Sequence, residues 1–365
     1  MNPVVPSETS QGSEKTKPHA LGKPAATPFE SRILGTGSYL PPKLLTNTDL
    51  EKLVETNDAW IVERTGIRQR HIAADGEYTS DVGLVAAKLA LEASGLTAND
   101  VDMIIFCTVS GDQPTPSTAC VLQKKLGARN VMSFDLNAAC TGFVYGLTIA
   151  DQFIRSGIYE HILVVGAEVL HPFVNYKDRE TCILFGDGAG AVILGRSNAL
   201  PRTESTPPSK TDSKIYSAHL RADGSLGELF TLRAGGSAMP LSAEALERGD
   251  HYLSMKGREI FKHAVRTMSD VCQQALDANG MSMDDIDWLI PHQANLRIID
   301  AVGKHFGIPA EKVIVNVHDT GNTSAATVPI ALDQGVRDGR IRRGQNVLLT
   351  AFGSGLTSGS LLLKY

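Results

Sequence analysis

Two stretches of the chain show the same succession of apolar and polar positions, 185 residues apart. Residues 90–102 and 275–287 align without a gap and are identical at six of thirteen positions. Each has the pattern of a helix end, a glycine stop at Gly95 or Gly280, a short polar turn and an apolar strand. A repeat of this kind predicts a chain built from two similar halves.

The similarity continues beyond these stretches, because the same kinds of elements follow in the same order in each half. Both long helices end at a glycine seventeen residues after Cys140 or Asn322, which predicts equivalent places for these two residues. The paired predictions are strands at 103–109 and 288–292, strands at 131–136 and 313–318, long helices at 138–157 and 321–339, strands at 161–168 and 346–355, and antiparallel returns at 185–195 and 357–365.

Strands that alternate with helices predict a parallel sheet covered by helices. Two such units in tandem predict a pseudo-symmetric α/β molecule of five layers, with the halves packed face to face. We place the N-terminal half at residues 31–199 and the C-terminal half at 215–365, with a polar linker loop rich in Pro, Ser and Thr at 200–214. Residues 231–250 are predicted to form a second excursion, over the functional site.

Composition and charge narrow the class of protein. Hydrophobic residues make up 42% and charged residues 21% of the chain, as in soluble globular proteins. The net charge of -5 and the absence of a long Lys/Arg run argue against nucleic acid or an anionic membrane as a partner. Residues 1–30 lack the apolar core of a signal peptide and are predicted to be a disordered tail, and the chain contains no run of 18 apolar residues. We therefore expect a cytoplasmic protein.

The five cysteines show neither CxxC pairs nor the spacing of a metal site, which argues against disulfides and predicts no bound metal. Cys140 stands apart, because it lies where a predicted strand turns into a long helix through Asn137, Ala138 and Ala139. A helix N-terminus favours the thiolate and lowers a thiol pKa from about 8.5 towards neutrality. Cys140 is therefore a candidate nucleophile. The other cysteines, predicted to be buried and inert, are Cys107, Cys120, Cys182 and Cys272.

Three further segments follow predicted strands, at the edge where open α/β sheets bind ligands. His292 follows one apolar strand directly, and Asn322 begins the turn before the second long helix. By themselves, these residues are also compatible with a core histidine and a helix cap. Ser354, between two glycines after the last parallel strand, can direct a backbone N–H at an oxyanion. Together with Cys140 they form a set suited to acyl chemistry.

Several long motifs occur in the order of a known family: GTGSYLP, DAWIVERTGIRQRHIA, AACTGF, FGDGAG, WLIPHQANLRI and HDTGNTSAA. On these motifs the chain, from about Ser31 to Tyr365, closely resembles β-ketoacyl-acyl-carrier-protein synthase III, the initiating condensing enzyme of type II fatty acid synthesis. The resemblance implies the thiolase-like five-layered fold and a homodimer. It also implies an acyltransferase that condenses an acyl-coenzyme A primer with malonyl-acyl-carrier-protein through an acyl thioester, with no cofactor beyond the coenzyme A thioester substrate.

The family's catalytic triad falls on Cys140, His292 and Asn322. The histidine and asparagine are implied to donate hydrogen bonds to the malonyl thioester oxygen as enolate charge builds on it. The backbone N–H groups of Cys140 and Ser354 are implied to form the oxyanion hole. Phe352 is implied to line the site and to help expel the carboxylate product.

The resemblance also implies two binding surfaces. Trp60 and Arg64 map onto the coenzyme A tunnel, as an aromatic face for adenine and a cation for phosphate. Further residues implied to contact substrate or coenzyme A are Thr56, Arg258, Phe261, Ala294 and Asn295. The basic surface implied to receive the acidic carrier protein comprises Lys262, Arg297 and Lys304.

Three positions depart from the family pattern. Pro172 stands where an arginine usually sandwiches the adenine with the tryptophan, so that stacking partner is expected to differ or to be missing. Arg258 replaces an asparagine and is expected to compensate. Thr115 replaces a phenylalanine that closes the acyl pocket across the dimer interface, which predicts a deeper pocket and a primer longer than acetyl.

Other reaction classes fit the sequence less well. Chain-elongating synthases have two histidines and degradative thiolases a second cysteine, whereas this chain has Asn322 and Ser354 at those places. A papain-like hydrolase uses Cys, His and Asn in this order, but its CGSCW-type signature is absent. A noncatalytic relative is expected to have lost Cys140 or His292. A related synthase of secondary metabolism, making a quinolone, polyketide or long-chain ketone from a longer primer, remains an alternative.

Overall fold

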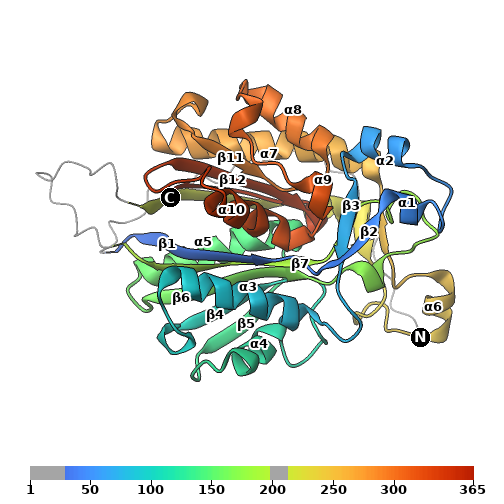
Figure 1. The fold of residues 1–365 in the computed structure, drawn as a ribbon, viewed down its shortest axis with the longest axis horizontal. Coiled ribbons are helices and arrows are strands. Elements are labelled where there is room, and N and C mark those ends of the chain that lie inside the picture. The colour runs from blue at the N-terminus through green and yellow to red at the C-terminus, as the bar shows by residue number, and fades with distance from the viewer. Residues whose placement is uncertain (1–28, 198–212) are drawn as a thin grey trace, which may run out of the picture.

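The computed structural model of the chain describes residues 29–197 and 213–365 (Figure 1). The predicted tail at 1–30 and the predicted linker at 200–214 lie almost wholly outside these residues. At their margins, Lys214 is the first residue of a strand and pairs with Glu30, with 2.9 Å between Nζ and Oε1. The linker boundary therefore lies one residue too far into the C-terminal half.

The N-terminal half contains a five-stranded sheet in the order β1-β7-β6-β4-β5. β4 runs parallel to β5 and β6, and β7 is antiparallel to its neighbours β6 and β1. The parallel centre and the antiparallel return were both predicted from the apolar runs. The strands are β1 (Ser31–Tyr39), β4 (Met103–Cys107), β5 (Met132–Leu136), β6 (His161–Glu168) and β7 (Gly188–Arg196).

The C-terminal half contains a four-stranded sheet in the order β11-β12-β13-β8, in which β11 and β12 are parallel. The predicted strand at 313–318 is wrong. After a single bridge between Val313 and Leu289 the chain leaves the sheet, because Oε1 of Gln293 accepts hydrogen bonds from the backbone of Asn316 (2.9 Å) and Val317 (3.3 Å). The strands are β8 (Lys214–Ala222), β11 (Trp288–Pro291), β12 (Asn346–Gly353) and β13 (Thr357–Lys364).

Helices and sheets form the five predicted layers (Figure 1). α3 (Thr79–Ser94) and α4 (Thr118–Leu126) cover the outer face of the first sheet, and α7 (Gly257–Asn279) and α8 (Leu296–Phe306) cover that of the second. The central layer consists of α5 (Gly142–Arg155) and α10 (Thr327–Arg337), whose apolar side chains share one core with both sheets.

The central layer is packed closely enough to require glycine in the strands beneath it. A Cβ on Gly166 of β6 would lie 2.4 Å from the carbonyl oxygen of Ala325, and one on Gly190 of β7 would lie 2.7 Å from the backbone nitrogen of Ile330. The start of α10 therefore rests directly on the N-terminal sheet. This contact places the turn before α10 beside the turn before α5.

A buried aspartate fastens each central helix to β1. Asp151 of α5 accepts a hydrogen bond from the Ser31 hydroxyl. Asp333 of α10 accepts bonds from the hydroxyls of Thr36 (2.7 Å) and Ser38 (2.6 Å). The first strand of the N-terminal half thus holds a helix from each half.

The turns before α5 and α10 have the same unusual backbone. Each is a short 3₁₀ turn, Ala139–Thr141 or Ser324–Ala326, and begins with a residue in the left-handed region. The φ angles are +48° at Ala139 and +50° at Ser324. Because left-handed backbone is rare for residues with a side chain, the coincidence marks these turns as equivalent.

This equivalence corrects the predicted match between Cys140 and Asn322. Counted from the turns, Asn137 matches Asn322 and Cys140 matches Ala325. The predicted match was counted back from the glycine after each helix. Because α5 has 14 residues and α10 has 11, this count places the match three positions away from the one that the turns show.

Smaller elements close the end of the molecule that lies on the right in Figure 1. The predicted excursion at 231–250 corresponds to a loop that begins at β9, contains α6 and ends at β10, which pairs with β9. Among the described residues, no helix combines the length and apolar character needed to cross a membrane. The elements are β2 (Lys43–Thr46), α1 (Asn47–Leu50), α2 (Asp58–Thr65), β3 (Gln69–Ile72), β9 (Phe230–Leu232), α6 (Ala243–Arg248), β10 (Leu253–Met255) and α9 (Val317–Thr320).

Candidate active site

Cys140 lies in the 3₁₀ turn before α5 and is 4% exposed. Burial raises the pKa of its thiol to about 12, the hydrogen bond with Ser324 opposes that rise, and the nearby Glu168 carboxylate adds to it. The predicted lowering of this pKa by the helix N-terminus is therefore wrong for the unliganded site. The thiol is protonated at neutral pH and must lose its proton during the reaction.

His292 follows β11 and is 5% exposed. Its backbone N–H donates to the Thr350 carbonyl (2.8 Å), which extends the sheet by one residue, and its ring Nδ1 lies 2.7 Å from the Thr327 hydroxyl. Burial lowers the pKa of the ring to about 3. His292 is thus a neutral imidazole at physiological pH.

Asn322 is held by its backbone and by one end of its side chain. The backbone donates to the Leu184 carbonyl (2.8 Å) and accepts from Gly186 (3.1 Å). Its side-chain Oδ1 accepts from the backbone of Ser324 (2.8 Å). Because the oxygen is occupied in this way, the Nδ2 amide group is the end left to donate to a ligand.

Ser324 connects the three predicted catalytic residues. It shares a hydrogen bond with the Cys140 thiol and donates its backbone N–H to Asn322. Its carbonyl accepts the backbone N–H of Thr327, whose hydroxyl lies 2.9 Å from that oxygen and 2.7 Å from Nδ1 of His292. The turn before α10 therefore brings the nucleophile and both polar residues into one hydrogen-bonded unit.

Glu168, at the end of β6, anchors this turn to the N-terminal sheet. The carboxylate is fully buried and shares a hydrogen bond with the Ser324 side chain. It accepts further bonds from the hydroxyl of Thr108 (2.9 Å) and from the backbone of Val109 and Ser110 (both 3.1 Å). Burial raises its pKa even so. Neither Glu168 nor Ser324 was expected from the sequence, although Ser324 lies inside the HDTGNTSAA motif.

A cavity of about 420 Å³ opens beside Cys140. Its wall is mainly apolar and includes residues of the predicted excursion. His292, Asn322 and Phe352 are not among the residues that line it, and Phe352 is instead packed in the core of the C-terminal half. The lining residues are Val109, Asn137, Ala138, Ala139, Cys140, Leu170, Phe185, Phe230, Thr231, Leu232, Leu253, Ser324, Ser354, Gly355 and Thr357.

The glycine-rich turn after β12 lies against the Cys140 turn. A Cβ on Gly353 would lie 2.8 Å from the Cys140 backbone nitrogen. The hydroxyl of Ser354 donates to the Phe230 carbonyl, and that of Thr357 donates to the Ala138 carbonyl (3.0 Å). The backbone segments of the predicted oxyanion hole, at Cys140 and Ser354, are therefore neighbours.

The predicted coenzyme A residues gather where α2 meets the start of α8. Asn295 caps α8 and donates from Nδ2 to the Arg64 carbonyl (3.0 Å), which joins the two helices. Arg64 lies over the Trp60 ring, 4.5 Å from its centroid. Thr56 is half-buried and its hydroxyl has no hydrogen-bond partner among the described residues. Ala294 is half-buried beside Asn295.

A second arginine near Trp60 bears on the expectation drawn from Pro172, that the stacking partner differs or is missing. Arg179 also lies over Trp60, 4.8 Å from the ring centroid, and donates to the Glu55 carbonyl (3.3 Å). The arginine partner of the tryptophan is therefore present seven residues beyond the position inferred from the sequence. Arg258, expected to compensate for its loss, is exposed at the start of α7.

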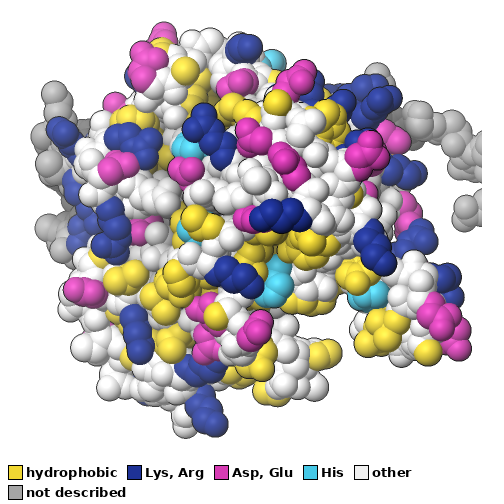
Figure 2. Space-filling view, turned by 45° about the vertical axis from the view of Figure 1, so that its right-hand side comes forward, with side chains coloured by type: hydrophobic (Ala, Val, Ile, Leu, Met, Phe, Trp, Pro, Cys, Tyr) yellow, Lys and Arg dark blue, Asp and Glu magenta, His cyan; other side chains and the backbone are white. Residues whose placement is uncertain are grey.

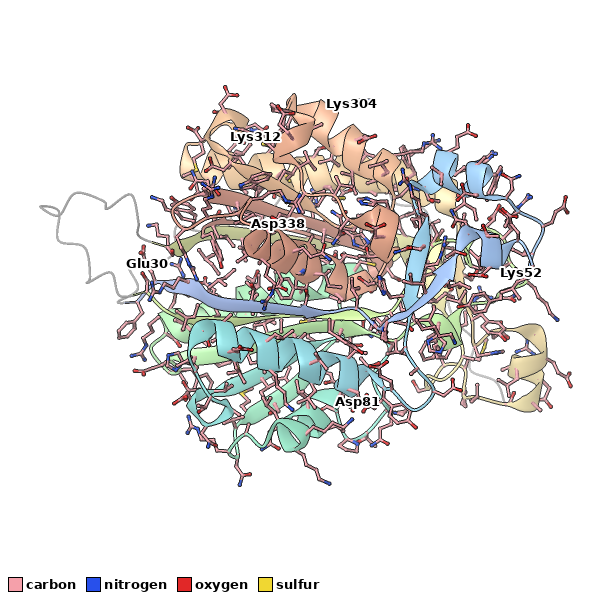
Figure 3. The ribbon with its side chains drawn as sticks, viewed as in Figure 1. Glu30, Lys52, Asp81, Lys304, Lys312 and Asp338 are labelled. Atoms are coloured by element: carbon pink, nitrogen blue, oxygen red, sulfur yellow. The ribbon has the colours of Figure 1, made fainter. Side chains whose placement is uncertain are left out.

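The predicted carrier-protein residues are exposed on α7 and α8. Arg297 lies over the half-buried ring of Phe261, 5.6 Å from its centroid, and Lys262 follows that ring on α7. Lys304 lies at the outer end of α8 (Figure 3). Figure 2, which turns the end of the molecule that carries α2 and α6 towards the viewer, shows Lys and Arg side chains interspersed with Asp and Glu.

Thr115 is exposed in the loop before α4 and does not line the cavity of its own chain. Four cysteines were predicted to be buried and inert. Cys107, Cys182 and Cys272 are buried, whereas Cys120 is exposed, so the predicted burial is wrong for Cys120. The described residues contain no group of His, Cys, Asp and Glu side chains that could hold a metal ion.

Comparison with known proteins places this site in a family. The family models described as 3-oxoacyl-[acyl-carrier-protein (ACP)] synthase III and its C-terminal part match residues 134–224 and 276–365. β-Ketoacyl-[acyl-carrier-protein] synthase III of Thiobacillus denitrificans is 52% identical over 92% of this chain and 99% of its own.

Solved structures give the same result. The 3-oxoacyl-[acyl-carrier-protein] synthase III of Aquifex aeolicus VF5 is 45% identical, with a TM-score of 0.82 over 92% of this chain and 100% of its own. The priming β-ketosynthase of the R1128 polyketide biosynthetic pathway is 33% identical, with a TM-score of 0.82 over 94% and 99%. The chain therefore belongs to the β-ketoacyl-[acyl-carrier-protein] synthase III family.

Proposed function

We propose that the protein catalyses the initiating condensation of fatty acid synthesis, in which an acyl-coenzyme A primer and malonyl-acyl-carrier-protein give 3-oxoacyl-acyl-carrier-protein, coenzyme A and carbon dioxide. The observation that carries the proposal is the single hydrogen-bonded turn that joins Cys140, His292 and Asn322 beside an apolar cavity. We propose that the reaction needs no cofactor beyond the coenzyme A thioester substrate.

In the first half-reaction Cys140 attacks the primer thioester. A new carbon–sulfur bond forms, the bond to the coenzyme A sulfur breaks, and the thiol proton ends on that leaving sulfur. Because the pKa of Cys140 is about 12 in the buried site, proton loss accompanies bond formation instead of preceding it. Backbone N–H groups of Cys140 and Ser354 stabilise the tetrahedral oxyanion.

In the second half-reaction the malonyl group loses carbon dioxide, the resulting carbanion forms a carbon–carbon bond to the acyl group, the bond from that group to the Cys140 sulfur breaks, and the sulfur takes up a proton. Enolate charge builds on the malonyl thioester oxygen, where His292 and the Nδ2 group of Asn322 donate hydrogen bonds. Both donors are neutral, so they remain in place across physiological pH. Removal of one such donor typically reduces the rate about 10²- to 10³-fold.

Coenzyme A is proposed to bind across α2 and α8. The Trp60 ring offers a stacking face to adenine, and Arg64 and Arg179, both within 5 Å of the ring centroid, supply charge for phosphate. The exposed cations Lys262, Arg297 and Lys304 suit the acidic surface of a carrier protein.

The acyl group is proposed to enter the apolar cavity, and a homodimer is proposed to complete it. Thr115 is exposed on its own chain, as expected for a residue that closes the pocket of a second subunit. A threonine in place of a phenylalanine leaves room for a primer longer than acetyl. We place the reaction in the cytoplasm.

The test is to incubate the protein with acyl-coenzyme A of graded chain length, measure the covalent adduct by intact mass, and then add malonyl-acyl-carrier-protein. We expect one acyl group on the unmodified chain, none on Cys140→Ala, and discharge of the adduct to 3-oxoacyl product. The absence of an adduct, or an undiminished adduct on Cys140→Ala, would refute the mechanism. A strong preference for acetyl would refute the prediction for Thr115.

A secondary-metabolite synthase with a longer primer is the alternative. The R1128 priming ketosynthase supports it by fold and at 33% identity, compared with 52% and 45% for the fatty acid synthases named above. The higher identities favour the fatty acid reaction. The graded primers also separate the two, because condensation only with long or unusual primers would support the alternative.

A further inference from the structure

The Thr327 hydroxyl is a buried group that touches a catalytic candidate and has no role in the reaction described so far. Thr327 is the first residue of α10 and is 2% exposed. Its Oγ1 lies 2.7 Å from Nδ1 of His292 and 2.9 Å from the carbonyl oxygen of Ser324. Among the described residues, no other hydrogen bond to Nδ1 is formed.

The Thr327 hydroxyl has one proton and can donate it to only one of these two neighbours. Which neighbour receives it decides which ring nitrogen of His292 is protonated. The ring is neutral, since burial lowers its pKa to about 3, so only one ring nitrogen is protonated. If Thr327 donates to Ser324, then Nδ1 of His292 must be the protonated nitrogen and donate to Thr327. If Thr327 donates to Nδ1, the ring proton lies on Nε2.

One contact and one chemical requirement favour donation of the Thr327 hydroxyl proton to the His292 ring. The Ser324 carbonyl already accepts the backbone N–H of Thr327, so it has a partner without the hydroxyl. Condensation, moreover, needs a hydrogen-bond donor on the ring, and because Nδ1 is occupied by Thr327, an unprotonated Nε2 would offer the developing enolate oxygen only a lone pair. The second argument rests on the function proposed above.

We propose that the Thr327 hydroxyl donates to Nδ1 of His292 and holds the ring in the tautomer that is protonated on Nε2. Thr327 is then a positioning residue for condensation. It acts on the substrate only through His292, and it has no part in the acylation of Cys140.

The tautomer is measured directly by the ring ¹⁵N chemical shifts of the unliganded, full-length chain labelled at histidine, with the His292 signals assigned from their absence in His292→Gln. We expect Nδ1 to be unprotonated and Nε2 protonated at neutral pH. A proton on Nδ1 overturns the inference. This measurement needs neither substrate nor a Thr327 variant that folds.

Kinetics of the two half-reactions supply the second test. Thr327→Val removes the hydroxyl and keeps the shape, and we expect it to slow condensation of a preloaded acyl-enzyme about 10²-fold while acylation changes little. Thr327→Ser keeps the hydroxyl and is expected to restore condensation. The matched control is Thr148→Val, which removes a helix hydroxyl bonded to the Val144 carbonyl (2.8 Å) in α5.

The outcomes separate this inference from the proposed function. Equal slowing of acylation and condensation in Thr327→Val, or no rescue by Thr327→Ser, means that the residue serves the fold alone and overturns the inference. If the unmodified chain forms no acyl-enzyme, the proposed function fails whatever the tautomer. If it acylates and condenses while Nδ1 is protonated, only the inference fails.

Discussion

The Gly353→Ala variant should distinguish the role of Cys140 as a nucleophile from the role of the backbone N–H groups as an oxyanion hole. The glycine has extended backbone (φ -145°, ψ 178°), which alanine adopts without strain. The effect must therefore come from the added Cβ, which would lie 2.8 Å from the backbone nitrogen of Cys140, 3.0 Å from Oγ1 of Thr357 and 3.2 Å from Cβ of Ala139. Ordinary Cβ contacts begin at 3.4 Å, so the two turns must separate by about 0.6 Å.

A separation of that size moves the backbone N–H of Cys140 relative to that of Ser354, the two donors proposed for the tetrahedral oxyanion. Loss of one such donor reduces the rate about 10²- to 10³-fold, and overpacking of this kind destabilises a protein by about 1 to 3 kcal/mol. We therefore expect Gly353→Ala to fold with reduced stability and to acylate at least about 10²-fold more slowly.

The assay follows acylation by stopped intact-mass measurements and, in parallel, alkylation of Cys140 by iodoacetamide, a reaction that forms no oxyanion. Alkylation should change much less than acylation. Gly224→Ala is the control, because a Cβ there meets no atom within 4 Å. Acylation of Gly353→Ala at the unmodified rate, or an equal loss in both reactions, would show that the two turns do not form an oxyanion hole.

Four further outcomes are expected. Arg179→Ala should raise KM for acyl-coenzyme A about 3- to 30-fold and leave kcat unchanged, because the cation–π contact with Trp60 is lost. Arg248→Ala, at an exposed arginine, is the control. An unchanged KM in Arg179→Ala would contradict a role of Arg179 in binding. Thr115→Phe should shift primer preference towards acetyl in competition assays, and an unaltered preference removes the basis for the deeper pocket. Because the pKa of Cys140 is raised to about 12, the rate of its alkylation should increase steadily from pH 7 to 9.5, as the thiolate fraction grows. Ser324→Ala should slow alkylation of Cys140 at a given pH, since the hydrogen bond from Ser324 lowers the pKa of the thiol. An alkylation rate that reaches a plateau near neutral pH would contradict a pKa raised by burial.

The layers and the three catalytic candidates follow from local patterns in the sequence. Alternation of apolar strands with helices predicts two covered sheets, and polar residues after strands fall at one edge of each sheet. Cys140 and His292 satisfy this rule, whereas Asn322 follows the short helix α9; the structure joins all three through Ser324. These features need only the order of elements along the chain.

The misjudged features depend on contacts between distant segments. The run at 313–318 is apolar enough for a strand, yet the Gln293 side chain takes its N–H groups. The pKa of Cys140 depends on burial by the opposite half, which no local motif encodes. Arg179 reaches Trp60 across 119 positions of sequence, a contact that no local pattern around either residue indicates.

The clamp that β1 forms on both central helices has a consequence for dividing the molecule. The sequence repeat invites separate expression of the two halves, but a C-terminal fragment would leave Asp333 buried in a helix without the Thr36 and Ser38 hydroxyls that it accepts from. Asp333 keeps its ion pair with Arg337 (2.9 Å) in such a fragment, but each lost hydrogen bond to a charged group removes about 1.5 to 3 kcal/mol, and two such losses are a large part of the stability of most domains. The repeat therefore reflects similar architecture and does not predict that each half folds alone: the C-terminal half needs β1 of the N-terminal half to complete the partners of Asp333.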